Sequence, residues 1–393
     1  MSLLPVAEAQ ARLLALGTIL PQERVPLMQA VGRWAGADVV AMRHQPADDL
    51  SAMDGYAIRF DDLPGPWRLV GESAAGARFA GEVAPGECVR IFTGATMPEG
   101  ADTILIQEEV GTEGATVTLT GDAPHRYGLH VRAKGADFGQ GRAVIHKGEL
   151  LNAAHIALAA MAGHGSIPVA RKVRIALIST GNELVQPGHP VGADQLPGSN
   201  GVMLQALLHG LPCEVMDKGI IRDDLSAIEA AIRGCADADI IVTTGGASVG
   251  DHDLVRPALA AAGAEIDFYK VAMKPGKPLM AGQLGKTVVL GLPGNPVSAF
   301  VTAQLFLKPL VAALSGAANP APDLVSLPVG AALSPVGKRA EYLRGHWDGR
   351  VVTPLRVQDS GAVYALSQAN VLIYRPINDG AMEAGAQVEC LLL

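Results

Sequence analysis

The sequence has 393 residues, a hydrophobic content of 49% and a formal net charge of −8 at pH 7. A chain of this length is too long for a single hydrophobic core, so we expect two to four domains. The acidic charge balance argues against a nucleic-acid partner, because such a partner requires a basic surface that neutralises phosphates.

Cysteine and histidine usage argues against two common kinds of site. The four cysteines are widely spaced and form no CxxC pair, so neither a disulfide framework nor a zinc site is indicated. The ten histidines show no metal-ligand spacing, which argues against a histidine-bound metal. Apolar stretches are broken by Gly or charge before the roughly 18 residues of a membrane span, and the start lacks a signal-peptide pattern. We therefore expect a cytoplasmic protein with no membrane partner.

The first part of the chain combines helical segments with a β-rich region. Apolar residues recur at helical spacing from Val6 to Leu16, and Gly17 follows as a stop signal. From about residue 41, short β-rich runs alternate with Gly and Pro, which predicts a β-rich domain over 41–131.

A further helix is expected after the β-rich region. Asn152 can cap an Ala-rich segment that reaches Gly163. Because this helix and the N-terminal helix flank the β-rich region, we expect them to pack together. Residues 1–40 and 132–170 would then form one discontinuous helical linker domain, with the β-rich domain inserted into it.

Residues 171–318 alternate strands and helices in a regular way. Asn200 and Asp224 can each cap a helix, and Asn295 with Pro296 makes an N-cap and N1 pair. Five helices alternating with five strands predict a doubly wound α/β domain. A Pro- and Gly-rich linker follows, and short alternating runs predict a small β-barrel domain over 319–393.

Three glycine-rich loops in the α/β domain follow apolar runs of strand length. We expect a parallel sheet, and ligands of such sheets bind at the carboxyl ends of the strands. The loops should therefore lie together at one edge of the sheet. The apolar run 239–243 precedes the loop 244–251. The run 268–273 precedes the loop 274–278, and the run 287–290 precedes the loop 291–296.

These loops carry groups that suit a phosphate. Backbone N–H groups around Gly245-Gly246 and over 291–295 can form two oxyanion cradles. Lys274 and Lys277 are held near prolines, so a stiff loop presents two ammonium groups. The alternative for such a pair is two solvated surface lysines.

Carboxylates accompany the cradles. Glu183, Asp251 and Asp253 would repel a phosphate unless a hard cation such as Mg²⁺ lay between them. Helix capping is the alternative for the two aspartates. In the β-rich domain and just after it, Asp54, Thr93 and Asp137 occupy polar turn positions, which physical chemistry alone interprets as ordinary turns.

Six motifs, taken together, resemble those of the MoeA family of molybdopterin molybdenumtransferases, which is also represented by the E domain of gephyrin. They occur in order and span nearly the whole chain. The motifs are Met53 to Ala57, Gly86 to Ala95, Ile178 to Leu184, Gly245 to Asp251, Lys274 to Pro278 and Leu292 to Ser298.

The resemblance implies a homodimer with four domains in each protomer. It implies a reaction in which adenylylated molybdopterin and molybdate are the substrates, Mg²⁺ is the cofactor, and AMP and the molybdenum cofactor are the products. Contact with the adenylyltransferase and with maturation proteins of molybdenum enzymes is a further expectation. The adenylyltransferase of the preceding step and a non-catalytic molybdopterin carrier are the competing interpretations.

The resemblance also assigns roles to matching positions. It implies catalytic roles for Asp54, Glu183, Asp253, Lys274 and Lys277. The implied substrate-binding residues are Thr93, Asp137, Gly245, Gly246, Ser248, Pro293, Gly294 and Pro296. The implied metal ligands are Asp251, Asp253 and Asp224, with Asp223 as the alternative to Asp224. Asn182 and Ala136 stand where family members usually carry Asp and Glu, so a metal would be bound differently if either acid is needed.

Overall fold

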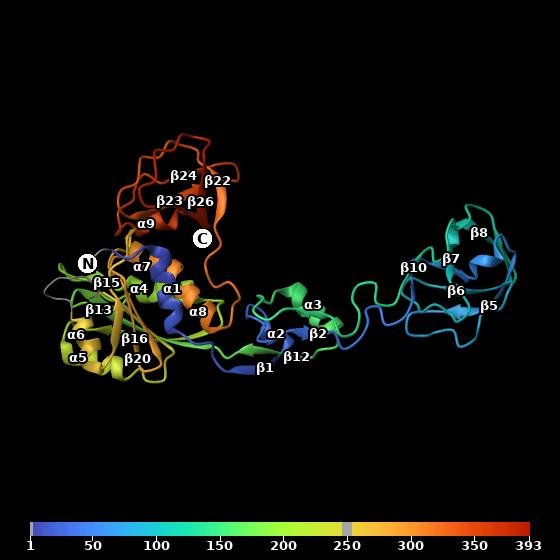
Figure 1. Cartoon of the computed structure of the whole chain (residues 1–393), viewed down its shortest axis with the longest axis horizontal. Coiled ribbons are helices and arrows are strands. Elements are labelled where there is room, and N and C mark those ends of the chain that lie inside the picture. Colours follow the sequence, from blue (N-terminus) through green and yellow to red (C-terminus); the bar gives the residue numbers. More distant parts are fainter. Residues whose placement is uncertain (1–2, 246–253) are drawn as a thin grey trace.

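The computed structural model describes residues 3–245 and 254–393. The molecule is elongated (Figure 1), with a β-rich sheet at one end and the α/β sheet and a C-terminal sheet together at the other. A smaller unit joins the two ends. The expectation of a multi-domain α/β fold is confirmed.

The α/β part is built on a sheet of six strands. These are β13 (Val173–Thr180), β16 (Cys213–Ile221), β17 (Ile240–Thr244), β18 (Glu265–Phe268), β20 (Met280–Leu284) and β21 (Thr287–Leu292). Their order is β16-β13-β17-β21-β20-β18. The first four strands pair in parallel, whereas β20 and β18 run antiparallel to their neighbours.

The prediction of a parallel sheet is therefore wrong at one edge. Only residues 285–286 connect β20 to β21, and a connection this short makes an antiparallel hairpin. The predicted strand over 268–273 is also wrong, because β18 ends at Phe268. Met273–Lys274 forms β19, which pairs with the C-terminal sheet instead.

Helices cover both faces of this sheet, and the buried side chains form two clusters. One face carries α1 (Val6–Leu16), α4 (Ser199–Leu208), α7 (Pro296–Thr302), the π-helical segment η3 (Ala303–Leu307) and α8 (Lys308–Leu314). The other face carries α5 (Leu225–Arg233) and α6 (Val255–Ala262). Strand residues that alternate in direction supply the two clusters, as period-2 geometry requires.

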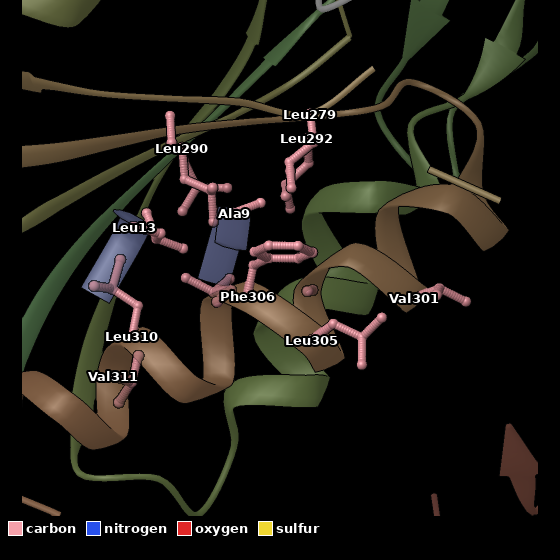
Figure 2. Close-up of a cluster of buried hydrophobic side chains, with 14 of the residues drawn as sticks. Ala9, Leu13, Leu279, Leu290, Leu292, Val301, Leu305, Phe306, Leu310 and Val311 are labelled. Atoms are coloured by element: carbon pink, nitrogen blue, oxygen red, sulfur yellow. The ribbon is translucent and has the colours of Figure 1, made fainter. Parts of the chain in front are cut away.

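The position of α1 contradicts the expectation that it packs with the helix after Asn152. Ala9 and Leu13 lie beside Phe306 and Leu310 and close to Leu290 of the α/β sheet (Figure 2). The apolar stripe of α1 is thus covered by the α/β core rather than by the linker unit.

The helical run from Pro296 to Leu314 is long and apolar enough to cross a membrane by length and composition. Lys308 nevertheless interrupts its apolar residues well before 18 of them have passed, as the sequence analysis expected. In the structure 83% of its apolar window is buried, because one side of the run packs on the sheet and on α1. The run is a core helix of the α/β fold.

The unit in the middle of the molecule, here called the linker unit, is formed by two separate segments of the chain. Strands β1 (Gln22–Pro26) and β12 (Ser166–Ala170) pair antiparallel, as do β2 (Val39–Val40) and β11 (Ala143–Ile145). Helix α2 (Leu27–Ala30) packs against α3 (Ala153–Met161). Asn152 caps α3 in a reciprocal capping box with His155, as its sequence position indicates.

The β-rich sheet has the strand order β7-β4-β6-β5-β9-β8. Its strands are β4 (Gly55–Ile58), β5 (Trp67–Ser73), β6 (Glu87–Ile91), β7 (Thr103–Ile106), β8 (Val110–Glu113) and β9 (Thr116–Leu119). Shorter elements of the same region are the pair β3 (Leu50–Ser51) and β10 (Val131–Arg132) and the 3₁₀ turns η1 (Phe60–Asp62) and η2 (Gln107–Glu109). In the α/β part, β14 (Leu184–Val185) pairs with β15 (Leu196–Pro197).

The C-terminal strands join into a closed ring. They are β22 (Val325–Pro328), β23 (Ala340–Trp347), β24 (Val352–Pro354), β25 (Val371–Arg375) and β26 (Gln387–Leu392), with helix α9 (Val363–Ser367) between β24 and β25. The pairing runs β24-β23-β25-β26-β22, and a bridge from Val329 to Val352 returns to β24. Tyr342 and Leu372 belong to the α/β core cluster, so the two parts share buried surface.

Two of the predicted helix caps differ from the structure. Asp224 caps α5 through the N–H of Ala227, as expected. Asn200 lies inside α4, whose N-cap position is Gly198, so the expected Asn200 cap is wrong. Asn295 is at the N-cap position of α7, but its side chain donates to Ser360 Oγ at 2.9 Å instead of capping the helix.

Leu13→Ala tests the assignment of α1 to the α/β core. Leu13 is fully buried, so the substitution should lower the free energy of unfolding of the α/β part by about 2–5 kcal/mol. Ile19→Ala, at a side chain that is 56% exposed, should change it by less than about 0.5 kcal/mol. Calorimetric unfolding of the full chain measures both. Equal effects of the two substitutions would contradict the packing of α1.

Candidate active site

A cavity of about 490 Å³ lies at the carboxyl ends of the parallel strands. Ser179 and Thr180 at the end of β13 line it, together with Thr244 at the end of β17 and Pro293 after β21. The first helical residues of α4 and α7 line it as well. This is the edge of an open α/β sheet where ligands bind, and we call this space the edge cavity.

Two of the predicted glycine loops meet in the edge cavity. Gly245 has φ +90°, and a Cβ atom there would lie 2.4 Å from the carbonyl oxygen of Thr180. A Cβ atom on Gly294 would lie 3.5 Å from Cα of Gly245. The backbones approach so closely because neither residue has a side chain, which leaves room for a ligand to approach the main chain.

The loop with two lysines reaches the same edge by an unexpected route. Strand β20 is antiparallel, so its first residue, Met280, pairs with Gly291 near the carboxyl end of β21. Pro278, two residues earlier, therefore lines the edge cavity. The sequence analysis placed this loop at the correct edge, although it assigned the wrong strand to it.

The two lysines of this loop differ in their ion pairing. Lys274 Nζ donates to Glu341 Oε1 of β23 at 3.0 Å, so a carboxylate offsets much of its charge. Lys277 is exposed, and among the described residues its ammonium group has no ion pair. Lys277 is therefore the more available cation for an anionic ligand.

Among the described residues, two carboxylates line the edge cavity. They belong to Glu183 and Asp223, which come from the loops after β13 and β16. Asp223 Oδ2 accepts a hydrogen bond from the N–H of Asn182 at 3.0 Å, and Asn182 Oδ1 accepts one from the N–H of Asp223 at 3.2 Å. This exchange holds the two loops side by side.

Asp224 has a different environment from Asp223. Its carboxylate accepts from the hydroxyl of Ser226 and the N–H of Ala227, and these bonds lower its pKa. The structure thus assigns a capping contact to Asp224 and places Asp223 at the edge cavity. Four predicted positions, Gly246, Ser248, Asp251 and Asp253, lie outside the described residues.

Two buried polar atoms that the sequence analysis did not select lie at the edge cavity. Thr180 Oγ1 and Asn200 Oδ1 are buried without a hydrogen-bond partner in the described part of the chain, and both residues line the cavity. The other end of the Asn200 amide, Nδ2, donates to the carbonyl of Gly294 at 2.7 Å. Buried polar atoms are normally paired, so these two are suited to a ligand. The sequence analysis interpreted Asn200 as a helix cap, so it did not identify this position at the cavity.

Asp54 and Thr93 form a pair in the β-rich sheet. The N–H and the hydroxyl of Thr93 both donate to Asp54 Oδ1, at 2.7 and 2.8 Å. These bonds lower the pKa of Asp54, with a smaller contribution from Arg90, and keep the carboxyl ionised. Arg90 lies over the rings of Tyr56 and Phe92, with its guanidinium carbon 5.1 and 4.9 Å from their centroids.

The predicted site residues that the structure describes do not lie in one place. Glu183, Gly245, Pro293, Gly294 and Pro296 line the edge cavity. Asp54 and Thr93 lie on the β-rich sheet, at the opposite end of the molecule from the α/β sheet (Figure 1). Asp137 is exposed between the two, where its N–H donates to the carbonyl of Gln45. Within residues 3–245 and 254–393, no three His, Cys, Asp or Glu side chains form a metal-binding group.

Comparison with known proteins gives matches over nearly the whole chain. The MoeA N-terminal region (domain I and II) matches residues 4–163, a probable molybdopterin binding domain matches 176–313, and the MoeA C-terminal region (domain IV) matches 326–393. Molybdopterin molybdenumtransferase of Nostoc sp. is 35% identical, over 94% of this chain and 88% of its own length. Molybdopterin molybdenumtransferase 2 of Mycobacterium tuberculosis is 35% identical, over 93% of both chains. The molybdopterin biosynthesis MoeA protein of Pyrococcus horikoshii OT3 aligns over 100% of both chains with a TM-score of 0.87 and 27% identity.

Thr93→Val should raise the pKa of Asp54 toward its ordinary value. The substitution removes the hydroxyl donor and leaves the N–H donor, so the shift should be partial. Carboxyl ¹³C chemical shifts followed against pH measure it. Thr118→Val, on β9 of the same sheet, is the matched control and should leave the Asp54 titration unchanged. An unaltered titration in Thr93→Val would show that the hydroxyl bond is absent in solution.

Proposed function

The chain belongs to the MoeA family, and from this premise we propose that it transfers molybdenum to adenylylated molybdopterin with Mg²⁺-dependent release of AMP. The coarser assignment is a transferase of molybdenum cofactor biosynthesis, as the names of its relatives state. The observation that supports the finer reaction best is the edge cavity, where glycine backbone and the carboxylates of Glu183 and Asp223 meet and whose wall at Pro278 adjoins Lys277.

Substrate anions would be held by the loops at the edge cavity. Gly245 and Gly294 leave main-chain groups accessible, and Thr180 Oγ1 and Asn200 Oδ1 offer unpaired polar atoms. Lys277 is next to Pro278 of the cavity wall and can contribute its charge to a phosphate or to molybdate. Such fixed groups bind charge without reorganising, which is how preorganised sites stabilise a transition state.

The residues at the edge cavity fit a magnesium ion. Mg²⁺ typically takes one or two carboxylates together with phosphate oxygens and water, and Glu183 and Asp223 supply two carboxylates from adjacent loops. We propose that these two residues, with Asp251 and Asp253 of the sequence motif, hold the ion. When bound, it would offset negative charge on the phosphate that leaves with AMP.

The remaining site residues would come from a second protomer. Asp54 and Thr93 are too far along the elongated chain to reach the edge cavity of their own protomer (Figure 1), so we propose a homodimer in which they complete the partner's site. Large apolar side chains exposed on and near the linker unit support a surface for a second copy. They are Met28, which is 78% exposed, with Val31, Val40, Met42, Leu150 and Met161.

Several finer expectations are retained as proposals. The β-rich domain would span 41–131, and the C-terminal β-barrel would span 319–393. The molybdopterin-binding domain would be a doubly wound α/β domain over 171–318. Helix α1 packs on the α/β domain, so the linker domain of 1–40 and 132–170 would begin after it. A cytoplasmic location and contacts with the adenylyltransferase and with maturation proteins of molybdenum enzymes also remain proposals.

Release of AMP from adenylylated molybdopterin in the presence of molybdate and Mg²⁺ tests the reaction. Lys277→Ala should weaken AMP binding by about 10- to 100-fold, the usual effect of losing a hydrogen bond to a charged group. Lys274→Ala should weaken it less, because Glu341 already offsets that charge. Lys286→Ala, at an exposed lysine of the β20–β21 turn, is the control. Absence of AMP release by the wild-type protein would rule out the proposed reaction.

Mixed dimers test the division of the site between protomers. Asp54→Ala and Glu183→Ala should each inactivate the protein when present in both protomers. After random exchange of the two variants, half of the dimers are mixed, and each contains one intact site if the site is shared. About one quarter of wild-type activity should then return. If both residues act within one protomer, no mixed dimer contains an intact site and activity stays absent.

A further inference from the structure

A second cavity, of roughly 540 Å³, lies where three parts of the chain meet, away from the edge cavity. The linker unit contributes Trp34 and Leu150, and the helical run of the α/β part contributes Gln304 and Lys308. The segment between the α/β and C-terminal parts closes it with Pro320 and Pro322. Figure 1 shows α8 as the helix of the α/β part that faces the linker unit. The volume is typical of a small-molecule site, for which about 300–1,000 Å³ is usual.

Two polar side chains of this cavity, Gln304 and Lys308, have no partners among the residues that the structure describes. Gln304 is only 6% exposed, yet its amide makes no hydrogen bond to any of them. Lys308 is half-buried without an ion pair to the described residues, and burial lowers its pKa. An amide on a largely buried side chain and a half-buried ammonium group both gain from a hydrogen-bond acceptor beside them. Both groups would be satisfied by an anionic acceptor in the cavity.

The local helix geometry places these two side chains next to each other. Gln304 lies in the π-helical segment η3, and Lys308 begins α8 directly after it. A π-helical turn is rare and is frequently found at functional sites. Residues four apart lie on one face of a helix, and Ala312, a further four residues on, continues the wall. Gln10 of α1 donates to the carbonyl of Leu305 at 2.8 Å, which supports the segment from the opposite side.

The walls and the charges define what the cavity can bind. Trp34 pairs with Leu150 through a backbone bridge, and with the two prolines they offer an apolar surface for a flat ligand. Glu149 and Asp323 also line the cavity, and neither forms an ion pair with Lys308. Two carboxylates against one ammonium group disfavour a ligand with several negative charges.

We propose that this second cavity is a binding site for a small aromatic carboxylate. The carboxylate would accept hydrogen bonds from Lys308 and Gln304, and the ring would lie against Trp34 and the proline segment. Its occupant would contact the linker unit, the α/β helix and the connecting segment together. The connecting segment is already tied to the linker unit, because Ala318 N–H donates to the carbonyl of Gly148 at 3.1 Å.

Benzoate is the probe for this proposal, and the full chain is the material. Benzoate should quench or shift Trp34 fluorescence with a dissociation constant of about 1 mM, a normal affinity for so small a ligand. Trp34→Phe should remove the optical signal. Ligand-observed NMR, which does not depend on Trp34, should report the same binding.

Variants of the two polar residues test the assignment of the carboxylate. Lys308→Met should weaken benzoate about tenfold or more, Lys308→Arg should retain it, and Gln304→Leu should weaken it severalfold. Lys286→Met, at an exposed lysine outside the cavity, should have no effect. Benzyl alcohol, which lacks the charge, should bind the wild-type protein and Lys308→Met equally. The proposal is wrong if benzoate does not bind, or if its affinity is the same in Lys308→Met and the wild type.

Discussion

The buried helical run from Pro296 to Leu314 is the element on which the rest of the structure depends. Its first turn forms one wall of the edge cavity, and its later part forms one wall of the second cavity. Twelve residues separate Pro296 from Lys308, which corresponds to about 18 Å along a helix. Phe306 and Leu310 of this run belong to one cluster with Leu13 of α1 and Leu290 of the sheet (Figure 2). Both cavities are therefore fixed to one hydrophobic core.

The sequence predicted the edge cavity well because its loops have strong local signals. Glycine-rich segments after apolar runs identified the loops at Gly245 and Gly294, and parallel pairing of β13, β17 and β21 brings them to one edge. The hairpin of β20 and β21 was missed, because a short apolar run does not reveal its direction. The packing of α1 was missed for a similar reason. An amphipathic pattern shows that a helix buries one face, but it does not show which surface covers that face.

Side-chain roles were harder to predict than loops. Asp223 and Asp224 are adjacent in the sequence, but one lines the edge cavity and the other caps α5. The cap at Asp224 has a local signal, but the position of Asp223 depends on Asn182 from another loop. The same holds for Lys274, whose partner Glu341 lies 67 residues away in the C-terminal sheet. Contacts of this kind are set by tertiary structure, and sequence patterns carry no signal for them.

The charges around the edge cavity give a meaning to the different ion pairing of the two lysines in one loop. The chain has a net charge of −8, and Glu183 and Asp223 add negative potential at the cavity itself. An anionic substrate would be repelled unless fixed donors and cations outweigh these carboxylates. Glu341 holds Lys274 in place but reduces its attraction for an anion, whereas Lys277 has no ion pair among the described residues. A divalent cation between the carboxylates and the substrate would change the sign of the local potential. This repulsion is the electrostatic reason for including Mg²⁺ in the proposed reaction.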